Sequence, residues 1–185
     1  MVESKYKTFW RRFGAGLIDG LIFLPLGFID PWKYSQHIPI FLLVTWFLFH
    51  ETVWYFYSVL MHGRYGQTLG KMACKIKVID KSESRPITYR QAIFRDSLLI
   101  IVGIILSMNM LPDVLQGKDP YKMTDPKQIL FFAFWMSISL LWFAAELITM
   151  LTNKKRRAIH DYIASSVVVK LSNDAVHSDA PKGGA

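Results

Sequence analysis

The sequence predicts an all-α membrane protein, built as a bundle of four transmembrane helices with a small cytoplasmic pair of strands. Apolar residues make up 52% of the 185 residues, and the mean hydropathy is +0.24. Both values lie above the norm for soluble domains, and the apolar excess is gathered into blocks of roughly the length of a bilayer span. Lys and Arg then alternate between the connections, as they do when short cytoplasmic loops carry the positive charge.

Four apolar blocks stand out. They are Trp10–Ile29, Pro39–Met61, Ser97–Leu111 and Ile129–Leu151. The third is short for a span and becomes long enough only if its helix begins near Thr88, where Gln91 completes a capping box. That start carries Arg90, Arg95 and Asp96 into the headgroup zone. We therefore expect helices near residues 10–29, 39–61, 88–111 and 129–151.

Charge placement predicts the topology. Basic residues gather in the first twelve residues, between the second and third blocks, and after the fourth. They are Lys5, Lys7, Arg11 and Arg12; Arg64, Lys71, Lys75, Lys77, Lys81, Arg85, Arg90 and Arg95; and Lys154, Lys155, Arg156 and Arg157. The connection after the first block has only Lys33, and the loop before the fourth balances its lysines with aspartates. This pattern predicts a multi-pass protein of the cell membrane with both termini in the cytoplasm. The net charge of +8 then reflects topology and contact with anionic lipid, and no nucleic-acid partner is expected.

The rest of the chain divides around these spans. Residues 1–9 form a cytoplasmic lead, residues 10–171 the membrane domain, and residues 172–185 a polar tail expected to be disordered. The first block lacks a small-residue cleavage site and is expected to stay as a span. Alternation near residues 75–80 and an apolar run near 166–171 predict two strands that pair beneath the membrane.

Asp19 lies inside the first apolar block, where a carboxylate is costly unless it meets a partner, water or a proton. Arg12 is seven residues away, which is roughly 10 Å along a helix axis and too far for a direct ion pair. The partners of Asp19 must therefore come from other segments.

Other acids lie in or beside the spans. His50 and Glu51 fall near the centre of the second block, and Glu146 falls about two turns before the end of the fourth. Such groups need a polar cavity, an interhelical hydrogen-bond network or protonation. The candidate transport or ion-binding residues are therefore Asp19, Glu51, His50 and Glu146. An acid that only joins two helices explains Asp19 and Glu51 equally well. For Glu146, an interfacial position is as consistent as an interior one.

Motifs for enzymatic chemistry are weak. The segment GQTLGK lacks the four-residue gap and the following Ser or Thr of a nucleotide-binding loop. The adjacent pairs His50-Glu51 and His160-Asp161 do not have the spacing of metal ligands. We expect no enzyme activity, no cofactor and no metal site.

Three separated segments resemble the signature regions of the RDD family of small integral membrane proteins. They are RRFGAGLIDG, GQTLGKMACKIKVID and NKKRRAIHDYIASSVVV, and the resemblance extends from Trp10 to Lys170. The arginine and two aspartates that name the family fall on Arg12, Asp19 and Asp161. Its glycine-rich loop falls on Gly66, Thr68, Gly70 and Lys71. One departure is Ala164-Ser165-Ser166, where the family often has Ala-Gly-Thr.

The resemblance implies a helical bundle and two hypotheses for function. In the first, the protein transports a small ligand or cation through membrane-embedded carboxylates, with cation/proton antiport as one form of that transport. Four spans without an internal repeat would then call for a homo-oligomer. In the second, it is a non-transporting adaptor or regulator of a membrane protein partner, and Arg12, Asp19 and Asp161 form a structural charge network.

Overall fold

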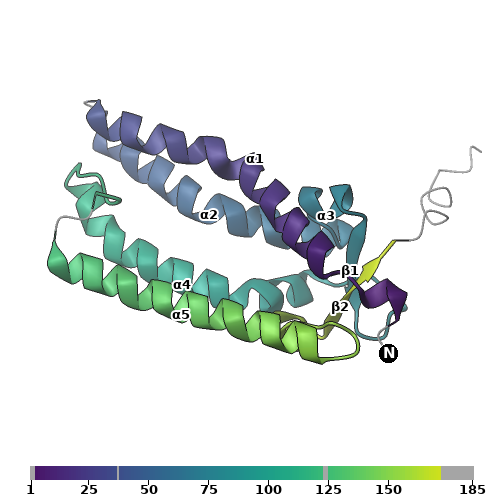
Figure 1. Ribbon diagram of the computed structural model, residues 1–185. Coiled ribbons are helices and arrows are strands. Elements are labelled where there is room, and N and C mark those ends of the chain that lie inside the picture. The colour runs from purple at the N-terminus through teal and green to yellow at the C-terminus, as the bar shows by residue number, and fades with distance from the viewer. Residues whose placement is uncertain (1–2, 37, 123–124, 172–185) are drawn as a thin grey trace, which may run out of the picture.

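Four long helices dominate the computed structural model, which describes residues 3–36, 38–122 and 125–171 (Figure 1). They are α1 (Phe9–Ser35), α2 (Ile40–Tyr65), α4 (Tyr89–Leu115) and α5 (Pro126–Thr152). Within the described ranges these four helices are long and apolar enough to cross a membrane. The predicted fold class is confirmed, since 72% of the protein is helical and the strands form one small sheet.

The shorter elements gather at one end of the bundle, beside the start of α1 and the end of α5 (Figure 1). They are η1 (Ser4–Tyr6), α3 (Leu69–Ala73), β1 (Ile76–Asp80), α6 (Ile159–Ile163) and β2 (Ser166–Lys170). We call residues 3–8, 66–88 and 153–171, which include these elements, the polar cap. Because an even number of spans lies between residues 3–8 and residues 153–171, the two ends of the membrane domain meet in the same cap.

The strands pair as the sequence predicts. β1 and β2 are antiparallel, with Val78 opposite Val168 and Asp80 opposite Ser166. The alternation along β1 buries Ile76 and Val78, which pack with Ala15 of α1 in the core of the cap. The pairing therefore fixes the end of the chain to its middle and both to the first span.

Helix ends depart from the predicted ones. α1 continues to Ser35 rather than ending near Ile29, and it passes through Pro25 without a break. An interior proline is tolerated in a membrane helix, where neighbouring groups satisfy the freed backbone. α4 begins where predicted, since Thr88 Oγ1 accepts from Gln91 N (3.3 Å) and Gln91 Oε1 from Thr88 N (3.0 Å). The predicted disordered tail lies outside the described residues.

The end opposite the cap holds a small apolar core between α2 and α4, formed by Leu43, Phe47, Met110 and Val114. Elsewhere the long helices leave large apolar side chains exposed, among them Phe28 at 72% and Leu141 at 71%. A water-soluble protein rarely exposes so continuous an apolar surface. Lipid or another protein must cover it.

Candidate functional site

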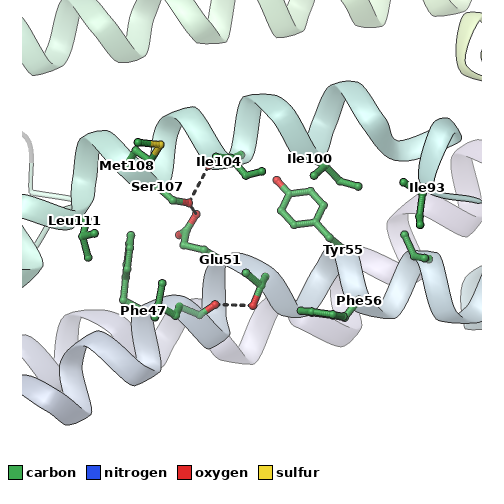
Figure 2. Close-up of a pocket in the computed structure, with 14 residues that line it drawn as sticks. Phe47, Glu51, Tyr55, Phe56, Ile93, Ile100, Ile104, Ser107, Met108 and Leu111 are labelled. Atoms are coloured by element: carbon green, nitrogen blue, oxygen red, sulfur yellow. Dashed lines mark hydrogen bonds between the residues drawn. The ribbon is translucent and has the colours of Figure 1, made fainter.

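Glu51 lies near the middle of α2, at membrane depth, and faces α4 (Figure 2). Its Oε2 accepts a hydrogen bond from Ser107 Oγ (3.1 Å), and its Oε1 accepts one from Tyr121 Oη (2.8 Å). His50 Nδ1 lies 3.7 Å from Oε1. No Lys or Arg among the described residues forms an ion pair with Glu51, so neutral hydroxyls and one imidazole are its polar surroundings.

An apolar cavity of about 500 Å³ opens beside Glu51, between α2 and α4. Figure 2 shows Phe47 and Tyr55 of α2 and Ile104 and Met108 of α4 around it. A second cavity of about 260 Å³ on the α1 side of α2 is also lined by Glu51, together with His50 and Trp54. Glu51 therefore borders a cavity on each side of its helix.

Glycine makes the contact between Tyr55 and α4 possible. A Cβ added to Gly103 would lie 2.7 Å from Tyr55 Cζ, closer than real side chains approach. The tyrosine ring thus reaches the backbone of α4 beside Glu51 (Figure 2). This packing forms one wall of the cavity.

Asp19 is only 3% exposed, and its carboxylate is saturated by the glycine-rich loop and α2. Oδ1 accepts from Tyr57 Oη (2.7 Å) and Gly70 N (2.8 Å), and Oδ2 accepts from Thr68 Oγ1 (2.6 Å). Thr68 also caps α3, while Gly66 ends α2 in the left-handed region with a φ of 69°. The loop folds in this way because Gly66 adopts the positive φ, Thr68 caps α3 and donates to Asp19, and Gly70 brings its backbone amide to the same carboxylate.

Asp161 has no exposed surface, and two guanidinium groups from different spans bind it. Arg12 Nη1 of α1 lies 2.6 Å from Oδ2, and Arg95 Nη1 of α4 donates to Oδ1. Ala158 N adds a hydrogen bond of 3.0 Å. Burial alone would raise the pKa of Asp161, but the positive charges of Arg12 and Arg95 hold that pKa well below its usual range. We call Arg12, Arg95 and Asp161 the charge clamp.

His160 and Glu146 extend the clamp toward α5. Nε2 of His160 lies 2.7 Å from Arg95 Nη2, which can only donate, so Nε2 accepts and the ring proton sits on Nδ1. Nδ1 lies 2.5 Å from Glu146 Oε2 and directs this proton toward it. Burial and the charge of Arg95 lower the pKa of His160, which favours this neutral form. Glu146 is therefore part of the network at the cap rather than of the Glu51 site.

Lys71 of the glycine-rich loop lies between these networks and makes no ion pair with any described residue. Burial and the nearby Arg95 lower its pKa to about 8. His62 of α2 is 2% exposed, and its Nε2 has no hydrogen-bond partner in the described part of the chain. Within the same ranges, no group of three His, Cys, Asp or Glu side chains could hold a metal ion.

The sequence prediction missed several of these partners. Arg95 was expected in the headgroup zone, but it is 8% exposed and buried in the clamp. Its position three residues after the fully buried Ala92 places it on the inner face of α4, a periodicity visible in the sequence. Asp96, the next residue of α4, accepts from Ser58 Oγ of α2 at 2.5 Å, a partner that the sequence did not indicate. Tyr121 had no sequence signal, because it reaches Glu51 from a loop.

The fold and these networks define a small multi-pass membrane protein whose spans are joined to a polar cap by buried ion pairs. The chain belongs to the RDD family, whose model matches residues 6–165. Arg12, Asp19 and Asp161 all fall within the matched range. No curated protein and no solved structure gives a significant match to the chain.

Proposed function

We propose that this RDD protein transports a small cation across the cell membrane in exchange for a proton, with Glu51 as the carboxylate that binds both by turns. The supporting observation is that Glu51 lies at mid-span beside an apolar cavity and that, among the described residues, its close polar partners are Ser107, Tyr121 and His50. An ionisable side chain at that depth with no fixed cationic partner is typical of ion and proton pathways.

The two hydroxyls suit a carboxylate that changes its charge. Ser107 and Tyr121 donate to the ionised form, and each can rotate to accept a hydrogen bond when Glu51 takes up a proton. A bound cation would replace that proton as the compensating charge. Asp19 is less suited to this role, because three donors already saturate it.

The cavity walls favour a weakly hydrated cation. Phe47, Tyr55 and Phe56 contribute aromatic surface to a cavity that holds few polar groups. Removing water from a small inorganic ion is costly in such surroundings, whereas an aromatic face attracts an organic ammonium group. We infer that quaternary ammonium ions are bound in preference to sodium.

Transport also requires access from both sides of the membrane. One copy has four spans in its described ranges, and alternating access usually opposes two bundles around a central site. The apolar faces left uncovered on the helices can supply such a contact. We propose a homo-oligomer with the polar cap in the cytoplasm.

Reconstitution into vesicles tests this function. The purified protein is placed in liposomes that contain a pH dye, and sodium, potassium, lithium or tetraethylammonium is added outside. We expect cation-dependent proton efflux, largest for tetraethylammonium, that falls to the leak of empty vesicles in Glu51→Gln. Glu3→Gln is the matched control, because Glu3 lies on the exposed surface of the cap with its side chain 67% accessible. Equal flux in Glu51→Gln and the wild type would overturn the assignment of Glu51.

A second function has its own support. Asp19 and Asp161 are fully satisfied by hydrogen bonds and ion pairs, as expected of residues that hold a scaffold together. An adaptor or regulator would need this rigidity and no transport path. Absence of flux for every cation, with the reconstituted protein folded, would favour that function.

A further inference from the structure

A second large cavity lies between α1 and α5, away from Glu51. Its volume is about 540 Å³, within the usual range for ligand sites. Its apolar lining includes Phe9, Phe13, Leu17, Trp142, Phe143 and Leu147. Phe13, Leu17 and Phe143 are each more than half exposed, so the cavity is a cleft that opens along the lipid-facing surface.

The cap end of this cleft adjoins a basic cavity. A space of about 260 Å³ shares Phe9 with the cleft and is lined by Lys7 and Arg156. Neither side chain forms an ion pair with a described residue, and Arg156 Nη1 donates only to the Leu151 carbonyl (2.8 Å). Two uncompensated cations therefore lie where an apolar cleft reaches the membrane surface.

The polar groups on the inner wall of the cleft are already engaged. Arg12 binds Asp161, and Glu146 binds His160. They do not compete for a ligand at the basic end. The free charge at this site is positive and comes from Lys7 and Arg156.

We propose that this cleft binds one anionic phospholipid, with its phosphate on Lys7 and Arg156 and an acyl chain between α1 and α5. Basic pockets between transmembrane helices are known sites for acidic headgroups. The charge argues against a second copy of the chain, since a two-fold contact buries the same patch of both copies and would gather the Lys7 and Arg156 charges of both in one interface. A lipid supplies both the missing negative charge and the apolar cover.

Two glycines of α1 give a matched test of the acyl-chain position. A Cβ added to Gly16 or to Gly20 meets no atom within 4 Å, so either position accepts a larger side chain. Gly16 lines the cleft, and Gly20 does not. Gly16→Phe should therefore fill the cleft, while Gly20→Phe changes the same helix without obstructing it.

Native mass spectrometry of the full chain in detergent, titrated with phosphatidylglycerol or phosphatidylcholine, measures the binding. We expect one tight phosphatidylglycerol site, preferred by about 30-fold, the factor that two cations supply toward a headgroup with a net negative charge. The preference should disappear in Lys7→Gln/Arg156→Gln and persist in Lys118→Gln/Lys122→Gln, which removes equal charge at the other end. Gly16→Phe should lower occupancy by both lipids at least fivefold, and Gly20→Phe should leave it unchanged.

Three results would overturn the proposal. They are equal binding of the two lipids by the wild type, an unchanged preference in the double variant, and equal occupancy in the two glycine variants. If the double variant does not fold, Lys7→Gln alone replaces it in the test. This variant should fold, because the Lys7 side chain makes no hydrogen bond with a described residue. A dimer that Gly16→Phe dissociates, with no lipid preference, would assign the cleft to a second copy.

Discussion

Asp161 and Glu51 are both carboxylates removed from bulk water, and their surroundings differ. Asp161 accepts from two guanidinium groups, a backbone amide and Ser166 Oγ. Glu51 accepts from two hydroxyls and has one imidazole nearby. A charge held by two fixed cations keeps one state, whereas a charge held by hydroxyls can be exchanged. The surroundings of Asp161 thus suit a structural role, and those of Glu51 suit the exchange proposed above.

The charge clamp predicts a large loss of stability in Asp161→Asn. The substitution leaves Arg12 and Arg95 buried without their counter-charge, which costs about 3–5 kcal/mol. Because the folded-state pKa of Asp161 is depressed, its contribution is present above the ordinary aspartate value of 3.8 and is lost as the pH falls below it. Denaturant titration in detergent at pH 7, followed by circular dichroism, measures the change.

The matched control for this prediction is Asp119→Asn at the other end of the bundle. Asp119 accepts a hydrogen bond from Tyr121 N (3.0 Å), and the asparagine oxygen can keep it. We expect a change within about 0.5 kcal/mol. Similar stabilities of the two variants would show that the clamp does not hold the cap to the spans.

Sequence reasoning identified the charged residues and, in one hypothesis, grouped Arg12, Asp19 and Asp161 in one network. The structure keeps Arg12 with Asp161 but leaves Asp19 outside this pair. The spacing of Arg12 and Asp19 excludes a direct pair, and the structure gives Arg12 to Asp161 and Asp19 to Tyr57. These pairings depend on how the cap folds back onto the spans. The spacing of residues within one helix or strand carries no information about that folding. Tyr121 illustrates the limit, because a loop residue that reaches a span leaves no periodic signal.

At the scale of elements, α3 depends on close approach to α1. Gly70 donates its backbone amide to Asp19, and a Cβ added there would overlap the carbonyl of Ala15 and lie 2.9 Å from Asp19 Cγ. Gly70→Ala must push α3 away from α1 and remove this hydrogen bond. We expect a loss of about 1–3 kcal/mol, measured by the same denaturant titration.

Gly16→Ala is the comparison, because the added methyl group meets no atom within 4 Å. Replacing an open helical glycine by alanine should be neutral or stabilise by up to about 1 kcal/mol. An equal change in stability in both variants would mean that the close packing of α3 against α1 at Gly70 does not set the cost.

The elements were more predictable than the contacts between them. Hydropathy identifies each span, and the chemistry of Thr88 and Gln91 fixes the start of α4. The predicted end of α1 was wrong by six residues, at Ser35 rather than Ile29, because Ile29 ends the apolar block while the helix continues into the residues that follow it. Hydropathy also cannot show which face of a span meets a neighbour.

For the whole molecule, the even number of spans places η1 and β2 at one end, and the charges then predict the orientation. The cap contains most of the basic residues. The opposite end balances Lys118, Lys122 and Lys127 with Asp113, Asp119 and Asp125. Short segments rich in Lys and Arg stay in the cytoplasm, so the cap is predicted to face inward.

Single cysteines test this orientation in a Cys74→Ser background. Ser84 in the cap and Lys118 at the opposite end are both exposed, so a cysteine at either position can react. A membrane-impermeant maleimide should label Lys118→Cys in intact cells and Ser84→Cys only after lysis. The reverse pattern would place the cap outside. Labelling of both in intact cells would contradict a membrane crossing by α4, because α4 is the span that separates the two positions.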